Sequence, residues 1–277
     1  MMQSPPKHLA LTCWSTGWIT GLILLLTACA SGPVPPDWQS NSLGSLKGFT
    51  SAYLAGNSKV AEFEFTRAKG DIASTGRIDL IARAELIRCA VRVASLEFDD
   101  CQGARETAAD AAAPERAYAN YLSPQRPALD ASQVALLPEQ HRPVAAARDD
   151  GARIASLSQI KDPLARLVAA GVLFERGQLA PASVDLAVNT ASDQGWRRPL
   201  LAWLGVQVKL LGAAGDTAGK AQVQRRIDLV LSNAATAATP AIVSVPVAVP
   251  IPALTPASVL PSVPTPATAP ASAAQRP

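Results

Sequence analysis

Residues 77–96 read RIDLIARAELIRCAVRVASL, and this stretch has the clearest helical pattern in the chain. Apolar side chains recur three or four positions apart, the spacing that gathers them on one face of an α-helix. The residues predicted to point inward are Ile78, Ala82, Leu86, Cys89, Ala90 and Val93, and those predicted to point outward are Arg77, Asp79, Arg83, Glu85, Arg88 and Arg92. Asp79 stands four residues before Arg83, the order that favours an ion pair along a helix.

Two further helices are predicted before this stretch. Their apolar residues follow the same spacing: Leu43, Leu46, Phe49 and Tyr53 in the first helix, and Ala61, Phe65, Ala68 and Ile72 in the second. Between them, Gly56 and Asn57 tolerate the left-handed backbone that often ends a helix. Ser58 can cap the helix that follows. We therefore expect a helical hairpin before residue 77.

The helical pattern resumes at Asp162, a residue type that caps helices, followed by Pro163 at a favoured first helical position. Gly177 and Gly195 are expected to end the first two helices of this region. Apolar spacing predicts helices over about 163–176, 182–194, 199–211 and 219–231. These four helices would form two hairpins.

The segment 103–161 is predicted to be an irregular connection, because five prolines divide it into short pieces. Within it, short helices are expected over Pro114–Leu122 and Ala131–Leu137. Residues 232–277 consist almost wholly of Ala, Pro, Val, Ser and Thr, a composition that favours a disordered tail. The predicted helical domain therefore spans residues 42–231, with 42–102 and 162–231 as its better defined parts.

Composition favours an all-α protein, since alanine and leucine dominate and aromatic residues make up 5% of the chain. The net charge is +3, and the arginines are spread along the chain rather than clustered. Proteins that bind nucleic acid usually carry a basic patch or stripe. We therefore expect no nucleic-acid partner.

An apolar stretch, residues 9–28, follows Lys7 and ends in Leu26-Thr27-Ala28-Cys29. This ending resembles the lipobox of bacterial lipoproteins. The resemblance implies that residues 1–28 are a signal peptide, and that Cys29 becomes the first mature residue and carries lipid, including palmitate. Ala30, in place of an aspartate, implies the periplasmic leaflet of the outer membrane. An uncleaved spanning helix is the alternative, because the apolar stretch approaches roughly 20 residues.

Residues 29–41 would then be an acylated N-terminus and a proline-rich spacer, with Gly32-Pro33-Val34-Pro35-Pro36 as its stiff part. Two or more acyl chains would hold the protein stably on the membrane.

Two cysteines remain once Cys13 is removed with the signal and Cys29 is lipidated. These are Cys89 and Cys101, and thiols left over in an oxidising compartment usually pair. A disulfide between them requires the helix at Cys89 to stop near Leu96 so that the chain can return. Two buried, unpaired cysteines are the alternative.

A repeat pattern is visible in the C-terminal hairpins. Ala170, Leu173 and Gly177 recur as Gly205, Val208 and Gly212, 35 residues apart, with Ala182 at a further small position. This order resembles tetratricopeptide repeats, in which small residues let the helices of a hairpin approach closely. The tryptophan, tyrosine and closing proline of strong repeats are missing here. A tetratricopeptide-like solenoid and an irregular helical bundle are therefore both open.

Residues for catalysis are scarce. His141 is the single histidine after residue 28 and is predicted to lie on the surface. The adjacent carboxylates Asp99-Asp100 and Asp149-Asp150 fall at predicted helix ends, where acids are common. Trp196 and Trp203 are expected in the core or at its rim. With no phosphate-binding loop and no nucleophile motif, the sequence predicts no enzyme, no metal or other cofactor and no small-molecule substrate.

These observations predict a membrane-anchored helical scaffold or adaptor for an unidentified protein of the cell envelope. Two alternatives stay open. The tail could act as a tether or cell-wall contact, since an extended chain of about 3.1 Å per residue reaches far. The domain could also be an envelope hydrolase or the activator of one.

Overall fold

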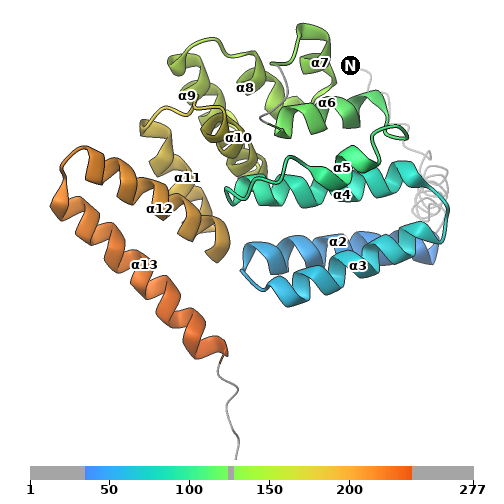
Figure 1. Ribbon diagram of the computed structural model, residues 1–277, viewed down its shortest axis with the longest axis horizontal. Helices are drawn as coiled ribbons and strands as arrows, with labels where there is room; N and C mark the ends of the chain where they lie inside the picture. The colour runs from blue at the N-terminus through green and yellow to red at the C-terminus, as the bar shows by residue number, and fades with distance from the viewer. Residues whose placement is uncertain (1–34, 124–127, 239–277) are drawn as a thin grey trace, which may run out of the picture. The chain divides into compact units, whose positions relative to one another are not determined.

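The computed structural model of the chain describes residues 35–123 and 128–238, with side chains up to residue 232. The predicted signal peptide, Cys29 and tail residues 239–277 lie outside them. The described helices up to Thr236 form one compact unit (Figure 1). The α-helices are α2 (Asp37–Leu54), α3 (Ser58–Ala73), α4 (Ile78–Ala94), α5 (Gln102–Glu106), α6 (Ala113–Leu122), α7 (Ala131–Leu136), α8 (Arg142–Ala146), α9 (Asp150–Gln159), α10 (Pro163–Glu175), α11 (Ala182–Asp193), α12 (Arg197–Ala213) and α13 (Thr217–Ala238), and a 3-10 turn, η1, covers Glu139–His141.

No strand occurs in the described ranges, and the predicted all-α class is confirmed. Helix α2 begins at Asp37, before the predicted domain start at residue 42, and α13 continues to Ala238, beyond Leu231. None of the helices described is at once long and apolar enough to cross a bilayer.

Helices α2 and α3 form the predicted hairpin, which lies on one side of α4 (Figure 1). Gly56 turns the chain with φ +84°. The predicted cap was misplaced by one residue: the Asn57 side chain, not Ser58, accepts the backbone N–H of Val60, at 3.3 Å. The buried face of α3 is the predicted one, and its members are Ala61, Phe65, Ala68 and Ile72.

Helix α4 is buried on more sides than its sequence pattern predicts. It contacts α2 and α3 on one side and α5, α6 and α10 on others. Ala84 and Val91, outside the predicted inward face, are therefore fully buried, and Glu85, which was predicted to point outward, is 8% exposed. Ile78, predicted inward, is 49% exposed. Because neighbours enclose α4 on several sides, it buries residues beyond one amphipathic face.

The predicted ion pair between Asp79 and Arg83 is wrong. Asp79 instead accepts from Arg77 at 2.7 Å, and Arg83 pairs with Glu115 of α6, also at 2.7 Å. Helix α6 packs on this part of α4 and brings Glu115 to the arginine. A partly buried carboxylate from another helix therefore replaces the local partner.

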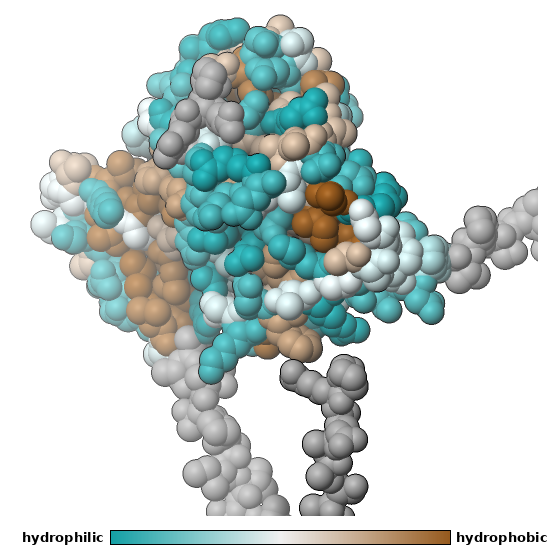
Figure 2. Space-filling view, turned by 45° about the vertical axis from the view of Figure 1, so that its right-hand side comes forward, coloured by the Kyte–Doolittle hydropathy of each residue, from teal (hydrophilic) through white to brown (hydrophobic). Residues whose placement is uncertain are grey.

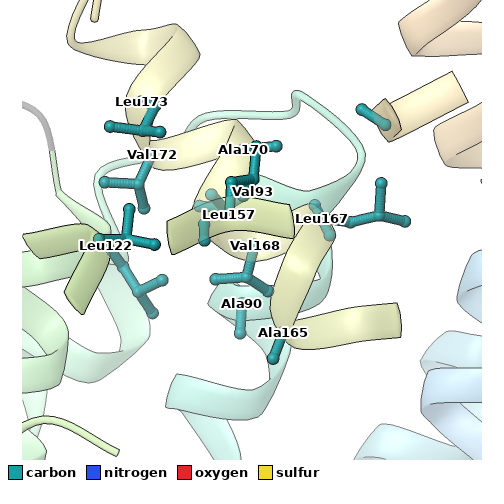
Figure 3. Close-up of a cluster of buried hydrophobic side chains, with 14 of the residues drawn as sticks. Ala90, Val93, Leu122, Leu157, Ala165, Leu167, Val168, Ala170, Val172 and Leu173 are labelled. Carbon is teal, nitrogen blue, oxygen red and sulfur yellow. The ribbon is translucent and has the colours of Figure 1, made fainter. Parts of the chain in front are cut away.

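The largest core cluster joins α4 and α10 to the helices around them (Figure 3). Ala90 and Val93 of α4 face Ala165, Val168 and Ala170 of α10 in this close-up. A second, smaller cluster fills the space between the α2–α3 hairpin and the opposite side of α4. Helix α4 thus separates two apolar cores and contributes to both.

The C-terminal helices begin and end largely as predicted. Asp162 accepts the backbone N–H of Ala165 at 2.7 Å, which confirms it as a cap. Gly177 and Gly195 have left-handed φ values of +63° and +65° and end α10 and α11. After α12, the left-handed turn residue is Gly215.

The small residues of the repeat pattern do not all lie where the tetratricopeptide resemblance implies. Ala170 is fully buried. A side chain built on Gly205 would meet no atom within 4 Å, and Ala182 is exposed. The close helix contact in this region is made by Gly171, where α10 meets Val93 of α4. The second half of the pattern therefore does not correspond to a close helix contact.

The segment 103–161 contains more helix than predicted. The two expected helices are present as α6 and α7, and Asp130 starts α7 with a capping box. In addition, α5, η1, α8 and α9 form where an irregular connection was expected. These short elements pack around α4, α6 and α10, and this packing stabilises turns that are too short to be stable alone.

Cys89 is bonded to Cys101, the pairing predicted from the cysteine count, with a Cα–Cα distance of 5.2 Å. Helix α4 ends at Ala94 as the pairing requires, and the chain then returns through left-handed residues Leu96, Asp100 and Cys101. Both cysteines are buried.

Opening this disulfide is expected to lower the free energy of unfolding by about 3 kcal/mol, because it closes a short loop in the unfolded chain. Urea denaturation of the oxidised and the dithiothreitol-treated protein measures the difference. The Cys89→Ala/Cys101→Ala double variant is the control and should not respond to dithiothreitol. Equal stability of the oxidised and reduced wild-type chains would contradict the bond.

Candidate functional site

Three hollows in the described residues border α6. The first has a volume of about 340 Å³ and lies between α4, α6, η1 and the start of α10. The second, of about 370 Å³, shares Leu86, Tyr118 and Pro138 with the first. The third, of about 340 Å³, shares Leu136 with the second but lies along the opposite face of α6. We call the first two hollows together the α6 groove.

The wall of the first hollow is almost wholly apolar. Leu86, Ala90 and Val91 of α4 form one side, and Ala165 and Val168 of α10 form the other. Ala90 and Ala165 are both buried, and their short side chains leave space between helices that larger residues would fill. The hollow therefore offers apolar surface to a ligand without rearrangement of the core.

His141 lies in the wall of this hollow and is 2% exposed, so its predicted surface position is wrong. The turn η1 after Pro138 places the imidazole against the rings of Tyr118 and Tyr121, with centroid distances of 5.6 and 5.2 Å. Burial lowers the pKa of His141 to about 4, and the Asp162 carboxylate opposes this only partly. The imidazole is therefore neutral at pH 7.

The Nδ1 atom of His141 has no hydrogen-bond partner among the described residues. A buried polar atom without a partner costs about 1–3 kcal/mol and is uncommon in folded proteins. The atom itself is enclosed by protein, so a ligand in the hollow does not reach it in this arrangement. His141 therefore contributes the surface of a buried, neutral ring to the wall.

Acidification is expected to destabilise the domain through His141. Its folded pKa of about 4 lies below its unfolded value of 6.5, so the unfolded chain binds more protons between these two pH values. This contribution to stability is complete above pH 6.5 and is lost as the pH falls toward 4, about 3 kcal/mol in all. Urea denaturation at pH 7 and pH 4 should show this loss in the wild type beyond the loss in His141→Phe. Equal losses would contradict a buried neutral imidazole.

The charged side chains around the α6 groove largely offset one another. Arg83 pairs with Glu115 at 2.7 Å, and both line the groove. Asp162 and Arg142 line it as well, and Arg142 donates to the carbonyl of Leu137 at 2.8 Å. The lining of the groove therefore has no excess of either charge.

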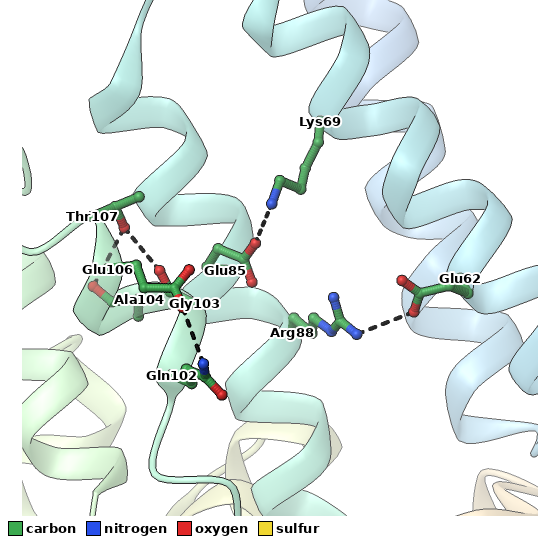
Figure 4. Close-up of polar contacts among 9 residues, drawn as sticks. All are labelled: Glu62, Lys69, Glu85, Arg88, Gln102, Gly103, Ala104, Glu106 and Thr107. Atoms are coloured by element: carbon green, nitrogen blue, oxygen red, sulfur yellow. Dashed lines mark hydrogen bonds and ion pairs between the residues drawn. The ribbon is translucent and has the colours of Figure 1, made fainter.

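A fourth hollow, of about 300 Å³, is charged and lies beside the disulfide, and Figure 4 shows the contacts around it. Lys69 contacts Glu85 at 2.6 Å, and Arg92 contacts Asp99 at 2.9 Å. Glu85 was predicted to point outward, but α3 and α5 enclose it, and the absence of a side chain at Gly103 leaves room for its carboxylate. These cations already have carboxylate partners, so the hollow is a weaker candidate than the α6 groove.

The adjacent carboxylates at helix ends are used locally. Asp99 contacts Arg92, and Asp100 accepts from Ser123 and Arg105. Asp149 caps α9 by accepting the N–H of Ala152 at 2.8 Å, and Asp150 pairs with Arg153. Neither pair shares a ligand or a proton in this arrangement. Within the described ranges, no group of three or more His, Cys, Asp or Glu side chains could hold a metal ion.

Comparison with protein-family models, with curated proteins and with solved structures gives no match for this chain.

Proposed function

We propose that this chain is a lipid-anchored, non-catalytic binding protein of the bacterial cell envelope, and that its helical domain acts as an adaptor for a protein partner. The observation that carries this proposal is the α6 groove. Its first hollow is almost wholly apolar, and the buried, neutral ring of His141 forms part of the wall. Apolar clefts with a few placed polar groups are the usual form of binding sites.

The side chains around His141 support binding rather than proton transfer. The rings of Tyr118 and Tyr121 pack against its ring in tilted orientations. Among the described residues, no hydrogen bond joins the imidazole to a carboxylate or a hydroxyl, and the Asp162 side chain accepts the N–H of Ala165 to cap α10. A general base normally has a group that orients it. The groove thus offers shape and apolar surface.

The anchor comes from the lipobox-like Leu26-Thr27-Ala28-Cys29. Lipid on Cys29 would hold the domain at the periplasmic face of the outer membrane, with residues 30–36 as the spacer. Anchoring confines the groove to a thin layer, which raises its effective concentration for partners in the same layer. A membrane-anchored domain with a groove for a partner has the two features that an adaptor needs.

Chemical cross-linking in intact cells, together with the mass of the mature N-terminus, tests this proposal. For the wild type, we expect the mass to show Cys29 with a diacylglyceryl group and an N-acyl group. We also expect cross-linking to enrich one envelope protein. Cys29→Ser should release the chain from the membrane and reduce capture of the partner. An unmodified, uncut N-terminus, or no envelope protein above background, would contradict the proposal.

Deleting residues 239–277 separates the tail alternative from the adaptor. Capture of the partner should survive this deletion if the helical domain holds the site. Loss of capture in the truncated chain would favour the tail as the binding element.

A further inference from the structure

We infer that the first hollow of the α6 groove is a binding site for one aliphatic acyl chain, and that the chain it takes is one of those carried by Cys29. Since it requires lipid on Cys29, this site rests on the proposed function. A chain bound there covers part of the groove that the adaptor offers to its partner, so the same site gains a regulation.

The buried part of the hollow's lining is almost purely hydrocarbon. Its buried members include Leu86, Ala90 and Val91 of α4 and Ala165 and Val168 of α10. The hollow's volume of about 340 Å³ lies within the usual range of small-molecule sites, about 300–1,000 Å³. A chain of CH₂ groups gains by leaving water here, and it has no polar group that would be left without a hydrogen bond.

The charged members of the lining lie where water reaches them. Arg83, Gln140 and Asp162 are exposed, and Arg83 is paired with Glu115 at 2.7 Å. The buried His141 ring is neutral. A ligand in the interior therefore meets no charge, and the ester or amide end of an acyl chain stays at the rim in water.

The hollow begins near the end of the domain at which α2 starts. Near the end of α3, Lys69 contacts Glu85 of α4 at 2.6 Å. Near the start of α3, Glu62 contacts Arg88, farther along α4, at 3.1 Å. Helix α3 therefore runs opposite to α4, and α2, its hairpin partner, runs parallel to α4. Arg83, close to the start of α4, is the first residue of that helix in the lining.

The chain before α2 is long enough to bring lipid to the hollow. Residues 29–36 lead from Cys29 to Asp37, and a fully extended chain of this length spans at most about 29 Å. Packed helices lie about 8–10 Å apart and rise 1.5 Å per residue, which places the lining on α4 within about 25 Å of the start of α2. A short tether also gives its acyl chain a high effective concentration at the hollow.

Docking of this chain depends on whether the protein is in a bilayer. Transfer of a methylene from water into an apolar hollow is favourable, whereas transfer from the hydrocarbon of a bilayer gains almost nothing. The chain therefore fills the hollow when the protein is off the membrane and returns to the lipid when the protein is anchored. Binding of a partner in the groove is then restricted to the anchored form.

Binding of a fluorescent fatty acid tests the site itself. The unlipidated mature chain with Cys29→Ser has no acyl chain of its own, and the probe is cis-parinaric acid, whose emission rises in apolar surroundings. One saturable site is expected, with palmitate as a competitor. Because the lining has no excess charge, the affinity should be equal at low and high salt.

Two variants and a matched control locate the site. Ile87 is 37% exposed, so Ile87→Glu places a charge in the lining without disturbing the core and should weaken binding about tenfold or more. Ala90→Phe fills the hollow and should abolish saturable binding, while circular dichroism verifies that the variant folds. Ile78→Glu is the same change on the same helix, at a residue that is 49% exposed and outside the lining. It should leave the affinity unchanged.

Photo-cross-linking of the lipidated mature chain tests the source of the acyl chain. A photoreactive residue at position 87 should form an adduct with the acylated N-terminal peptide in detergent diluted below its critical micelle concentration. In phosphatidylcholine vesicles this adduct should decrease by about tenfold or more. Position 63 is the control, because Phe63 is 64% exposed and lines neither hollow of the groove. It should form no such adduct under either condition.

No saturable site for cis-parinaric acid, or binding that ignores both Ile87→Glu and Ala90→Phe, would overturn the acyl site. Adducts of position 87 with phospholipid or detergent alone would overturn the assignment to Cys29 and assign the hollow to a membrane lipid. If Cys29 carries lipid and cells yield a cross-linked partner while no acyl chain enters the hollow, the adaptor function stands and only the acyl site fails. An unmodified N-terminus would contradict the proposed function itself.

Discussion

Replacing Trp203 by alanine is expected to lower the free energy of unfolding by about 3–5 kcal/mol. Trp203 has the largest volume of the fully buried residues in the described ranges. Its ring packs edge-on against Phe174 of α10 with a centroid distance of 5.8 Å, and its indole N–H donates to the carbonyl of Ala94 at 3.1 Å. The residue thus fixes α12 to the end of α4.

Urea denaturation followed by circular dichroism measures this effect. Trp203→Phe keeps an aromatic ring but leaves the Ala94 carbonyl without the indole donor, so a smaller loss of about 1–3 kcal/mol is expected. Leu210→Ala is the control, at an exposed residue of the same helix. A Trp203→Ala variant as stable as Leu210→Ala would contradict the docking of α12 on α4.

Adding a single methyl group at Gly171 is expected to destabilise the domain by about 4 kcal/mol, above the usual cost of overpacking. A Cβ atom there would lie 2.9 Å from Cγ1 of Val93 and closer still to the Val93 carbonyl oxygen. The obstacle is backbone, which a change of rotamer cannot relieve. Helices α4 and α10 would have to move apart along their contact in the largest core cluster.

Gly205→Ala is the matched control for Gly171→Ala. It places the same methyl group in the interior of α12, where a Cβ would meet nothing within 4 Å. Alanine favours a helix over glycine by about 1 kcal/mol, so this variant should be more stable than the wild type. The two substitutions should therefore change the melting temperature in opposite directions. A destabilised Gly205→Ala would instead support tetratricopeptide-like packing of the last hairpins.

Features of the fold that depend on neighbouring residues were predictable. The buried face of α3, the cap at Asp162 and the turns at Gly177 and Gly195 follow from spacing, side-chain chemistry and backbone preference within a few residues. The end of α4 before Leu96 followed from the reach of a short chain between two cysteines.

Features that depend on contacts between distant segments were not predictable. Glu85 is buried because α3 and α5 both cover that side of α4, and Arg83 pairs with Glu115 because α6 lies beside it. The burial of His141 depends on the way η1 packs against Tyr118 and Tyr121. The apolar pair Leu136-Leu137 just before Pro138 is the one local sign that this turn meets the core.

The groove itself has an even weaker sequence signal. Its first hollow exists because Ala90 of α4 and Ala165 of α10 line it, where larger residues would close the space. Alanine is common throughout this chain, so nothing in the sequence marks these two positions. The anchor at Cys29, in contrast, is predicted from the sequence alone.

Site-specific photo-cross-linking in intact cells tests the central claim, that an anchored helical domain binds a protein partner through the α6 groove. A photoreactive amino acid would replace Leu136 in the groove or, as the control, Leu229, which is 62% exposed on α13 and lines none of the three hollows. The account predicts an adduct from position 136 that contains one envelope protein and disappears with Ile87→Glu, which places a charge in the lining of the first hollow. No adduct from position 136, or an equal adduct from position 229, would contradict it.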